Sequence, residues 1–398
     1  MSSTRGASVS PRSQRRRDEI VDAASTLFAK LGYHRVGIDD VAGAVGITGG
    51  AIYKHFGGKQ DLLRHAIDGA LLPVEAAVGD AADADEAIAA LAVASTDQRR
   101  IGLLLTREVR ALEGDEGQAA FDRIDHVRSS ISALVGAHRS DIDAVEARLL
   151  GDAVLTLSSS PAQHTVVLPR SQSIAFLTEM GRRAVDVELP PASPSADSPP
   201  FPSRRATMLL DRRDLLIDAA IDLFGRRGYW AATMDDLGAA ADISGPSIYQ
   251  HFSSKADLLV AVFTRGNEGL RLGLSRAFDE GHGAAETLGL LVDSYVDFVL
   301  AHPGVNRLLM NEQMYLPELE RASVRGMQHR YVSEWVNLLQ QAQPGLEQHP
   351  ARFVTHAVLA MVNNRGPRQP GDGNRPAEAL VAVARALLLT PGWVELTS

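Results

Sequence analysis

The sequence lacks several features that would point to other classes of protein. None of its 398 residues is a cysteine, which excludes disulfide bonds and thiolate metal sites. No apolar run approaches the roughly 18 residues that a membrane-spanning helix needs, and the N-terminus has no apolar stretch typical of a secretory signal. We therefore expect a cytoplasmic protein with no membrane partner. The net charge of −9 argues against non-specific coating of nucleic acid, although local binding depends on where the charges lie.

The motifs of common enzyme classes are also missing. The chain has no glycine-rich phosphate loop, no G-x-S-x-G elbow, no H-E-x-x-H and no histidine cluster with ligand spacing. Its scattered histidines fit surface or core positions better than a site; they are His126, His138, His164, His282, His302 and His356. We expect no catalytic residue, no metal and no cofactor, and a helical enzyme is kept only as a remote alternative.

What the chain does contain is one stretch that occurs twice. Residues 17–63 run RDEIVDAASTLFAKLGYHRVGIDDVAGAVGITGGAIYKHFGGKQDLL, and residues 213–259 run RDLLIDAAIDLFGRRGYWAATMDDLGAAADISGPSIYQHFSSKADLL. At a constant offset the two match at 22 of 47 positions without a gap. Such self-similarity indicates an internal duplication, so the domain organisation follows from it.

Each copy predicts three short helices, of which the first two are marked by their ends. The apolar residues of the first helix recur at helical spacing; they are Ile20, Ala23, Ala24, Leu27, Phe28 and Leu31. Gly32 and Gly228 stand where that helix should end. In the second copy Thr233 is placed to cap the next helix with its hydroxyl, whereas Gly37 in the first copy is a weaker cap.

The third helix carries the most information about function. We expect a tight turn at Gly46 or Asp242, followed by a helix that Thr48 or Ser244 caps, and two helices joined by so short a turn are typical of a helix-turn-helix. The outward residues of the third helix are small or form hydrogen bonds, and a lysine follows it. In the first copy they are Thr48, Gly49, Gly50, Ala51, Tyr53, Lys54, His55 and Lys59; in the second they are Ser244, Gly245, Pro246, Ser247, Tyr249, Gln250, His251 and Lys255. Small residues let a helix approach a duplex, and the polar ones suit phosphates and base edges.

This pattern resembles the DNA-binding domain of the TetR family of bacterial transcriptional regulators. The resemblance lies in Gly-Tyr…Asp-Asp…Ile-Thr/Ser-Gly…Ile-Tyr-x-His-Phe-x-x-Lys-x-Asp-Leu-Leu, which both copies carry. It implies that each third helix enters the major groove of double-stranded operator DNA. The resemblance also implies backbone phosphate contacts by Tyr53, His55, Lys59, Tyr249, His251 and Lys255. Packing against neighbouring helices is the alternative role for the tyrosines and histidines, and a solvated face for the lysines.

The rest of the chain predicts an all-α protein of two TetR-like units. We expect a disordered basic arm over residues 1–14, which is a solvated tail or alternatively lies along the DNA backbone, a first DNA-binding domain over 15–66 and a first helical regulatory domain over 67–187. A Pro/Ser-rich linker over 188–206, a second DNA-binding domain over 207–262 and a second helical, ligand-binding domain over 263–398 complete the prediction. Residues 12–65 hold nine Lys/Arg against six Asp/Glu, whereas residues 204–260 hold seven against eight, so the second copy is the less basic.

The resemblance further implies a dimer interface and an effector cavity. In this family the last two long helices form the interface; by position these are 143–159 with 171–186, and 351–364 with 376–390. One chain would then supply both pairs and fold as an internal pseudo-dimer, although a homodimer is also open. Residues apolar enough to line a cavity, with an ordinary helical core as the alternative, are Leu104, Tyr295, Phe298, Met310, Met314 and Tyr315.

We therefore predict a bacterial one-component transcriptional regulator, a repressor that a small apolar ligand releases from DNA. The exposed faces of the two third helices differ, as in Lys54 against Gln250, so a pseudo-dimer should prefer an operator with unlike half-sites. The alternative is that one copy is degenerate and serves as a dimerisation or protein-interaction module.

Overall fold

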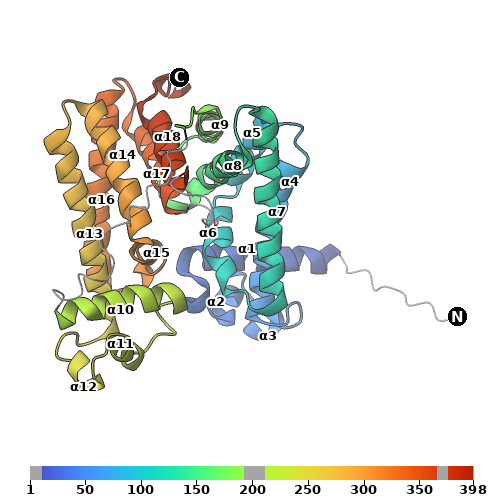
Figure 1. Cartoon of the computed structure of the whole chain (residues 1–398). Helices are drawn as coiled ribbons and strands as arrows, with labels where there is room; N and C mark the ends of the chain where they lie inside the picture. The colour runs from blue at the N-terminus through green and yellow to red at the C-terminus, as the bar shows by residue number, and fades with distance from the viewer. Residues whose placement is uncertain (1–10, 192–210, 365–374, 398) are drawn as a thin grey trace. The chain divides into compact units, whose positions relative to one another are not determined.

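The structure is a computed structural model that describes residues 11–191, 211–364 and 375–397. Throughout these ranges the secondary structure is helical with no strand, which confirms the all-α prediction (Figure 1). The contacts divide the chain into two compact units. Unit 1 comprises Met1–His138 with Ser158–Thr165, and unit 2 comprises Arg139–Leu157 with Val166–Ser398. Within the described ranges no helix is long and apolar enough to span a membrane.

Unit 1 begins with a three-helix domain whose core is apolar on one side of each helix. Ile20, Ala24 and Phe28 of the first helix are fully buried, at the helical spacing expected from the sequence. Long helices follow and complete the unit. The elements are α1 (Pro11–Leu31), η1 (Tyr33–Arg35), α2 (Ile38–Ala44), α3 (Gly49–Ile52), α4 (Lys59–Gly79), α5 (Ala84–Asp97), α6 (Ile101–Thr106), η2 (Glu108–Ala111), α7 (Gly114–His138) and η3 (Ser160–Gln163).

The start of α1 corrects the prediction of a disordered arm over residues 1–14. α1 begins at Pro11, so residues 11–14 are helical, while residues 1–10 lie outside the described part of the chain. Proline at the first position of a helix has its φ angle already set and loses no hydrogen bond there. Arginine and glutamine, which follow it, are good helix formers.

Unit 2 repeats the same order of helices after two helices contributed by the first half. The elements are α8 (Ala144–Ser159), α9 (Arg170–Asp186), α10 (Arg212–Arg227), α11 (Met234–Ala240), α12 (Gly245–Ile248), α13 (Lys255–Glu280), α14 (Ala284–Ala301), α15 (Pro303–Asn311), η5 (Gln313–Tyr315), α16 (Glu318–Ala342), α17 (Gln348–Asn363), α18 (Arg375–Leu389) and η6 (Val394–Thr397). The predicted linker, apart from residues 188–191, lies outside the described residues. The core of the second three-helix domain continues into α15, through Val305, Leu308 and Leu309.

The helix pairs expected to form an interface are present, and those of both halves lie within unit 2. The ring of Phe176 on α9 stacks on that of Trp393 at 5.3 Å between centroids and meets Phe353 of α17 edge-on at 6.2 Å. The Arg183 guanidinium lies 4.0 Å above the Trp393 ring. It also donates to the carbonyl oxygens of Thr390, at 2.8 Å, and Pro391, at 3.0 Å. The two halves of the chain are therefore joined by a shared core and not by the linker alone (Figure 1).

Candidate DNA-binding surfaces

The turn that precedes each third helix needs a residue in the left-handed region. Gly46 has φ 68° and Asp242 has φ 55°, which confirms the predicted turns. Glycine adopts this conformation without steric cost, and aspartate is among the few other residues that tolerate it. The same backbone path is thus built with different side chains in the two copies.

The structure confirms the predicted side-chain cap of the second helix but not the predicted caps of the third helices. The Thr233 hydroxyl accepts the amide of Asp236 at 3.1 Å, and the Asp236 carboxylate accepts the Thr233 amide at 3.0 Å, which confirms that cap. Thr48 and Ser244 occupy the cap positions of α3 and α12, but neither side chain accepts an amide, so that prediction is wrong. In the one-turn helix α3 a backbone carbonyl accepts the free amide in place of the side chain. The Thr48 carbonyl oxygen accepts the Ala51 amide at 2.9 Å.

Most predicted contact residues of both third helices face solvent. Tyr53 is 61% exposed and Tyr249 is 56% exposed, so neither tyrosine packs into the core. Thr48, Gly50, Lys54, Ser244 and Gln250 are also exposed, whereas Gly49, Ala51, His55, Ser247 and His251 are half-buried. The exposure of Gly245 and Pro246 lies outside what the structure describes. In both copies an exposed tyrosine and an exposed polar residue, Tyr53 with Lys54 and Tyr249 with Gln250, follow the end of the third helix.

Two neighbouring glycines of α3 have different reasons to be glycine. A Cβ atom at Gly49 would lie 2.2 Å from a carboxylate oxygen of Asp39, whereas one at Gly50 would meet nothing within 4 Å. A side chain at position 49 would therefore displace the Asp39 carboxylate of α2, whereas Gly50 leaves open space on the outer face. The sequence alone had suggested one common reason for both, a close approach to DNA.

The two lysines that follow the third helices point inward. Lys255 donates to the carbonyl oxygens of Tyr229 at 2.6 Å and Ala232 at 2.8 Å, and its Nζ atom lies 4.4 Å from the Tyr229 ring centroid. Lys59 lies 4.1 Å from the Tyr33 ring centroid. Burial lowers the pKa of both lysines, against the opposing effect of nearby carboxylates. In this arrangement each lysine holds the Gly-Tyr corner against the long helix, and a phosphate contact by either remains a prediction.

Two arginines that the sequence analysis did not single out hold the third helices in place. Arg17 donates to the carbonyl oxygen of His55, and its guanidinium lies 4.5 Å above the Phe56 ring. In the second copy Arg213 lies 4.9 Å above the Phe252 ring. The sequence carried a signal for this role, because both aligned copies begin with this arginine.

The remaining helices contact the Gly-Tyr corner differently in the two units. In unit 1 the buried carboxylate of Glu108 accepts the Tyr33 amide at 2.7 Å, and Arg107 donates to the Ala29 carbonyl at 2.7 Å. In unit 2 the Tyr315 ring stacks on Tyr229 at 5.6 Å and meets Trp230 edge-on at 5.3 Å. The first link consists of hydrogen bonds to the backbone, and the second is aromatic.

The residues predicted to line an effector cavity lie in both units and have different packing partners. Leu104 is a buried residue of α6 in unit 1. In unit 2, Tyr295 packs against Trp335 at 5.5 Å, Phe298 stacks on His302 at 4.8 Å, and Tyr315 belongs to the corner already described. Met310 is 37% exposed, and the side chain of Met314 lies outside the described residues. For these residues the alternative of ordinary core packing fits better.

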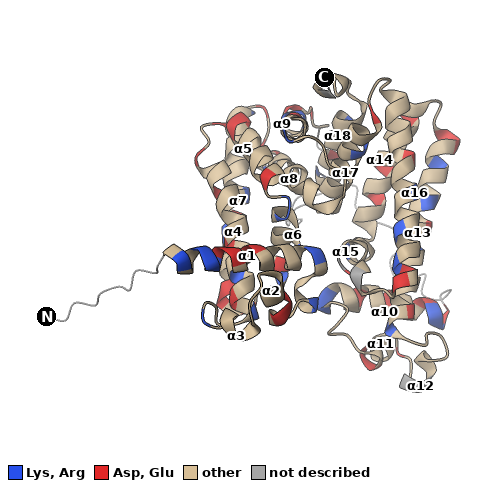
Figure 2. Ribbon diagram, turned by 180° about the vertical axis from the view of Figure 1, so that it is seen from behind, with Lys and Arg blue, Asp and Glu red and all other residues tan. Residues whose placement is uncertain are grey.

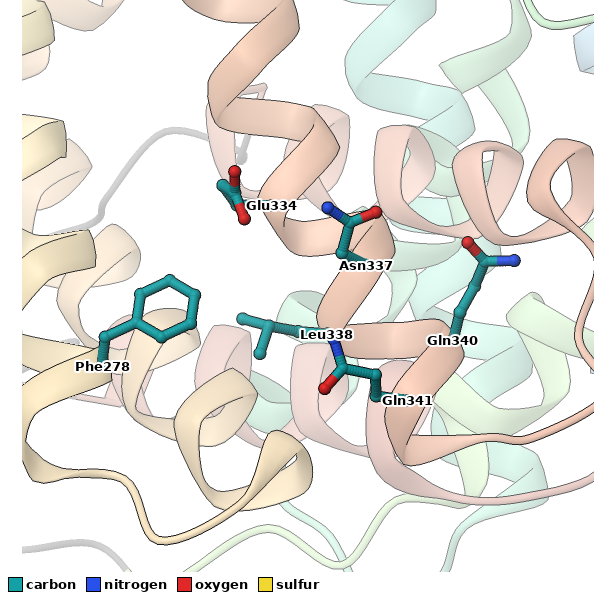
Figure 3. A pocket seen from close by; sticks show the side chains of 6 residues that line it. All are labelled: Phe278, Glu334, Asn337, Leu338, Gln340 and Gln341. Atoms are coloured by element: carbon teal, nitrogen blue, oxygen red, sulfur yellow. The ribbon is translucent and has the colours of Figure 1, made fainter.

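A hollow of about 430 Å³ lies between α13 and α16 (Figure 3). Its lining consists of Phe278, Glu334, Asn337, Leu338, Gln340 and Gln341, none of which the sequence had suggested. Four of these six side chains carry a carboxylate or a carboxamide and the other two are apolar, so the lining is mixed.

This geometry, two three-helix domains that each present a short helix after a tight turn, defines a helix-turn-helix DNA-binding protein. The family model for bacterial regulatory proteins of the tetR family matches residues 20–66 and 216–262. A model for the tetracyclin repressor-like C-terminal domain matches residues 281–366. The chain belongs to the TetR family and is a DNA-binding transcriptional regulator.

Curated relatives share parts of this chain. The HTH-type transcriptional activator FasR of Mycolicibacterium smegmatis is 32% identical over 151 residues, which are 38% of this chain and 68% of FasR. The HTH-type transcriptional repressor KstR2 of Rhodococcus jostii is 39% identical over 56 residues, 14% of this chain and 28% of that protein. Among solved structures, a TetR-family regulator from Bordetella parapertussis aligns with 44% of this chain and 93% of its own, at 21% identity and a TM-score of 0.42.

Proposed function

We propose that one chain acts as a complete regulator, in which two unlike helix-turn-helix domains are joined by an internal dimer interface. The observation that carries this proposal is the stack of Phe176 on Trp393 within unit 2, because it joins a helix of the first half to the end of the second. The ion pair between Asp143 and Arg375 and the bonds from Arg183 also link the halves. An interface of this kind needs no second chain.

The operator of such a regulator should have two different half-sites. By position in the repeat, Gly50 corresponds to Pro246, Ala51 to Ser247 and Lys54 to Gln250. Residues at these positions face the bases, so two unlike helices select two unlike sequences. A homodimer that used like copies would instead select a palindrome.

We further propose repression that a small apolar effector relieves, with no catalytic step. The match of the second helical domain to the tetracyclin repressor-like model supports a regulatory role for residues 281–366. The aromatic contacts among Tyr295, Tyr331 and Trp335 provide apolar side chains on α14 and α16, which an effector would contact only if this packing opened. An effector shifts the balance only if it binds the DNA-free state more tightly. Transcript levels from the operator in cells with and without the regulator test its sign, and a rise caused by the regulator would refute repression.

The stoichiometry of the complex tests the proposed architecture. Light scattering would give the mass of the chain alone and on a duplex selected from random sequence. One chain per duplex, on a site with unlike halves, is the expected result. Two chains per site would contradict the pseudo-dimer, and the variants Tyr53→Ala and Tyr249→Ala would then show whether one or both copies bind DNA.

A further inference from the structure

We propose that the first two turns of α1, Pro11–Arg17, form a basic arm that contacts the phosphate backbone of DNA beside the half-site of α3. This inference rests on the proposed docking of α3 on operator DNA, and it adds a contact that the helix-turn-helix does not include. Nothing in the repeated motif requires it, because the arm precedes the aligned copies except for Arg17.

The position of the arm follows from Arg17. Its guanidinium donates to the carbonyl of His55 and lies 4.5 Å above the Phe56 ring, at the end of the third helix. A second contact joins it to the His65 ring at 2.8 Å. Because these bonds fix α1 against the end of α3, the residues before Arg17 extend from the edge of the recognition surface.

The arm carries positive charge that the protein does not neutralise. Arg12, Arg15 and Arg16 are exposed, and their i, i+3 and i+4 spacing places them on one side of the helix. Arg16 forms an ion pair with Glu19 at 2.8 Å. The Gln14 side-chain amide donates to the carboxylate of Asp18, the other nearby acid, at 2.9 Å. Within the described part of the chain, neither Arg12 nor Arg15 has a hydrogen bond or an ion pair. Figure 2 shows blue arginine bands at this end of α1, and residues 11–17 contain no acid.

DNA phosphate is the occupant that this surface fits. The chain as a whole is acidic, with a net charge of −9, so the unpaired Arg12 and Arg15, on the helix that Arg17 joins to the end of the third helix, are a local exception. Neutralising a phosphate releases condensed counterions, which makes each such contact favourable and dependent on salt. Arginines held by helical backbone next to the third helix meet the strand that flanks the major groove.

The second unit has no counterpart of the arm in its described residues. α10 begins at Arg212, and Asp211, at the position of Arg15, caps that helix by accepting the Asp214 amide at 2.8 Å. Arg213 keeps the packing role of Arg17, 4.9 Å above the Phe252 ring. The anchoring arginine is thus shared, whereas the free charges are not, and the two half-sites should be held with unequal electrostatic strength.

The test is the salt dependence of operator binding by the full chain carrying Arg12→Ala and Arg15→Ala. If each arginine contacts one phosphate, the negative slope of log affinity against log salt should become shallower by about 2 between about 50 and 200 mM salt. Extrapolated to physiological salt, this corresponds to roughly 10- to 30-fold weaker binding. The charge-conserving double variant, Arg12→Lys with Arg15→Lys, should bind like the parent because phosphate contacts need the charge rather than the guanidinium. Hydroxyl-radical footprints of the Ala variant should shorten at one outer edge of the operator only.

A matched control removes the same charge far from the DNA-binding surface. Arg271 and Arg276 are exposed on α13, roughly 24 and 32 Å along the helix from its start at Lys255. Their double Ala variant should keep the parental slope. A parental slope in the arm variant, with an unchanged thermal midpoint, would overturn the inference while leaving DNA binding intact. A parent protein that binds no duplex would overturn the docking of α3 together with the arm. Two chains per site with the expected loss of slope would refute the pseudo-dimer but support the arm.

Discussion

At the scale of single residues, the two copies meet the same backbone requirements with different side chains. The left-handed turn is made by Gly46 in one copy and Asp242 in the other. The second helix is capped by the Thr233 hydroxyl in one copy, whereas in the other the Asp40 carboxylate accepts only the Gly37 amide. Conformation, rather than residue identity, is what the duplication has kept at these positions.

We predict that Gly46→Ala destabilises the first helix-turn-helix by about 1 kcal/mol, because a Cβ atom is disfavoured at φ 68°. No neighbour would clash with that atom, so the cost is one of backbone conformation alone. Gly46→Asp should cost less, since aspartate occupies the equivalent turn at Asp242. Hydrogen exchange of residues 38–52 measures both variants, and equal losses would show that the turn does not discriminate between the two side chains.

A second prediction concerns His356 of α17, where burial, helped by Arg352 and His329, lowers the pKa to about 4. The folded state thus favours the neutral ring, while in the unfolded chain the ring binds a proton below the ordinary histidine pKa of about 6.5. Stability should be complete above pH 6.5 and decline as the pH falls from about 6.5 to 4, by up to roughly 3 kcal/mol. Denaturant unfolding of unit 2 across this window, compared with His356→Gln, measures the effect. An unchanged pH slope in the variant would assign the loss to other groups.

At the scale of elements, the two short 3-10 helices η2 and η5 make the most informative difference between the units. Each contacts the corner that ends the first helix of its DNA-binding domain. Glu108 of η2 does so through a buried carboxylate, and Tyr315 of η5 through a stacked ring. A hydrogen bond to a backbone amide depends on direction, whereas a ring stack depends on contact area, so a signal from each helical domain would reach its DNA-binding domain through a different kind of contact.

We predict that Tyr315→Ala weakens operator binding by roughly fivefold, because an aromatic pair of this kind contributes about 1 kcal/mol to holding its partners. The stack fixes the Tyr229–Trp230 corner, to which Lys255 is also bonded. Tyr315→Phe keeps the ring and is the matched control. The test is the affinity of the parent and of both variants for one operator duplex. A Phe variant that binds as weakly as the Ala variant would mean that the hydroxyl, not the ring stack, forms the link.

At the scale of the whole molecule, the first half ends inside the core of unit 2. Phe176 is fully buried between Phe353 and Trp393, both from the second half. A flexible linker alone would leave the two halves independent, but a shared core makes the stability of unit 2 depend on residues of both.

We predict that Phe176→Ala lowers the stability of unit 2 by about 3–5 kcal/mol and shifts the fluorescence of Trp393, because it leaves a cavity beside the indole ring. Phe176→Leu, which fills most of that space, should lose much less. Phe121→Ala on α7 of unit 1, a ring that is 39% exposed, is the control for removing a phenylalanine elsewhere. Denaturant unfolding followed by tryptophan fluorescence reports on unit 2, since Trp230, Trp335 and Trp393 all lie there. A small loss for Phe176→Ala would contradict a shared core.

The sequence by itself determined the fold class, the duplication and the family. These are carried by local patterns: helical spacing of apolar residues such as Ile20, Ala24 and Phe28, glycines at helix ends, and a motif of many fixed residues within 47 positions. It also identified the tyrosines of the third helices, Tyr53 and Tyr249, which the structure shows exposed. Such features depend on residues near one another in the chain, so a single sequence is enough to reveal them.

Only the tertiary structure decided where long side chains end and which distant segments share a core. It turned Lys59 and Lys255 inward and brought Phe176 against Trp393. A lysine or an aromatic residue has the same local pattern whether it meets solvent, a carbonyl or another ring. Which of these it meets depends on packing between segments far apart in sequence, where burial and hydrogen bonding select one arrangement among many.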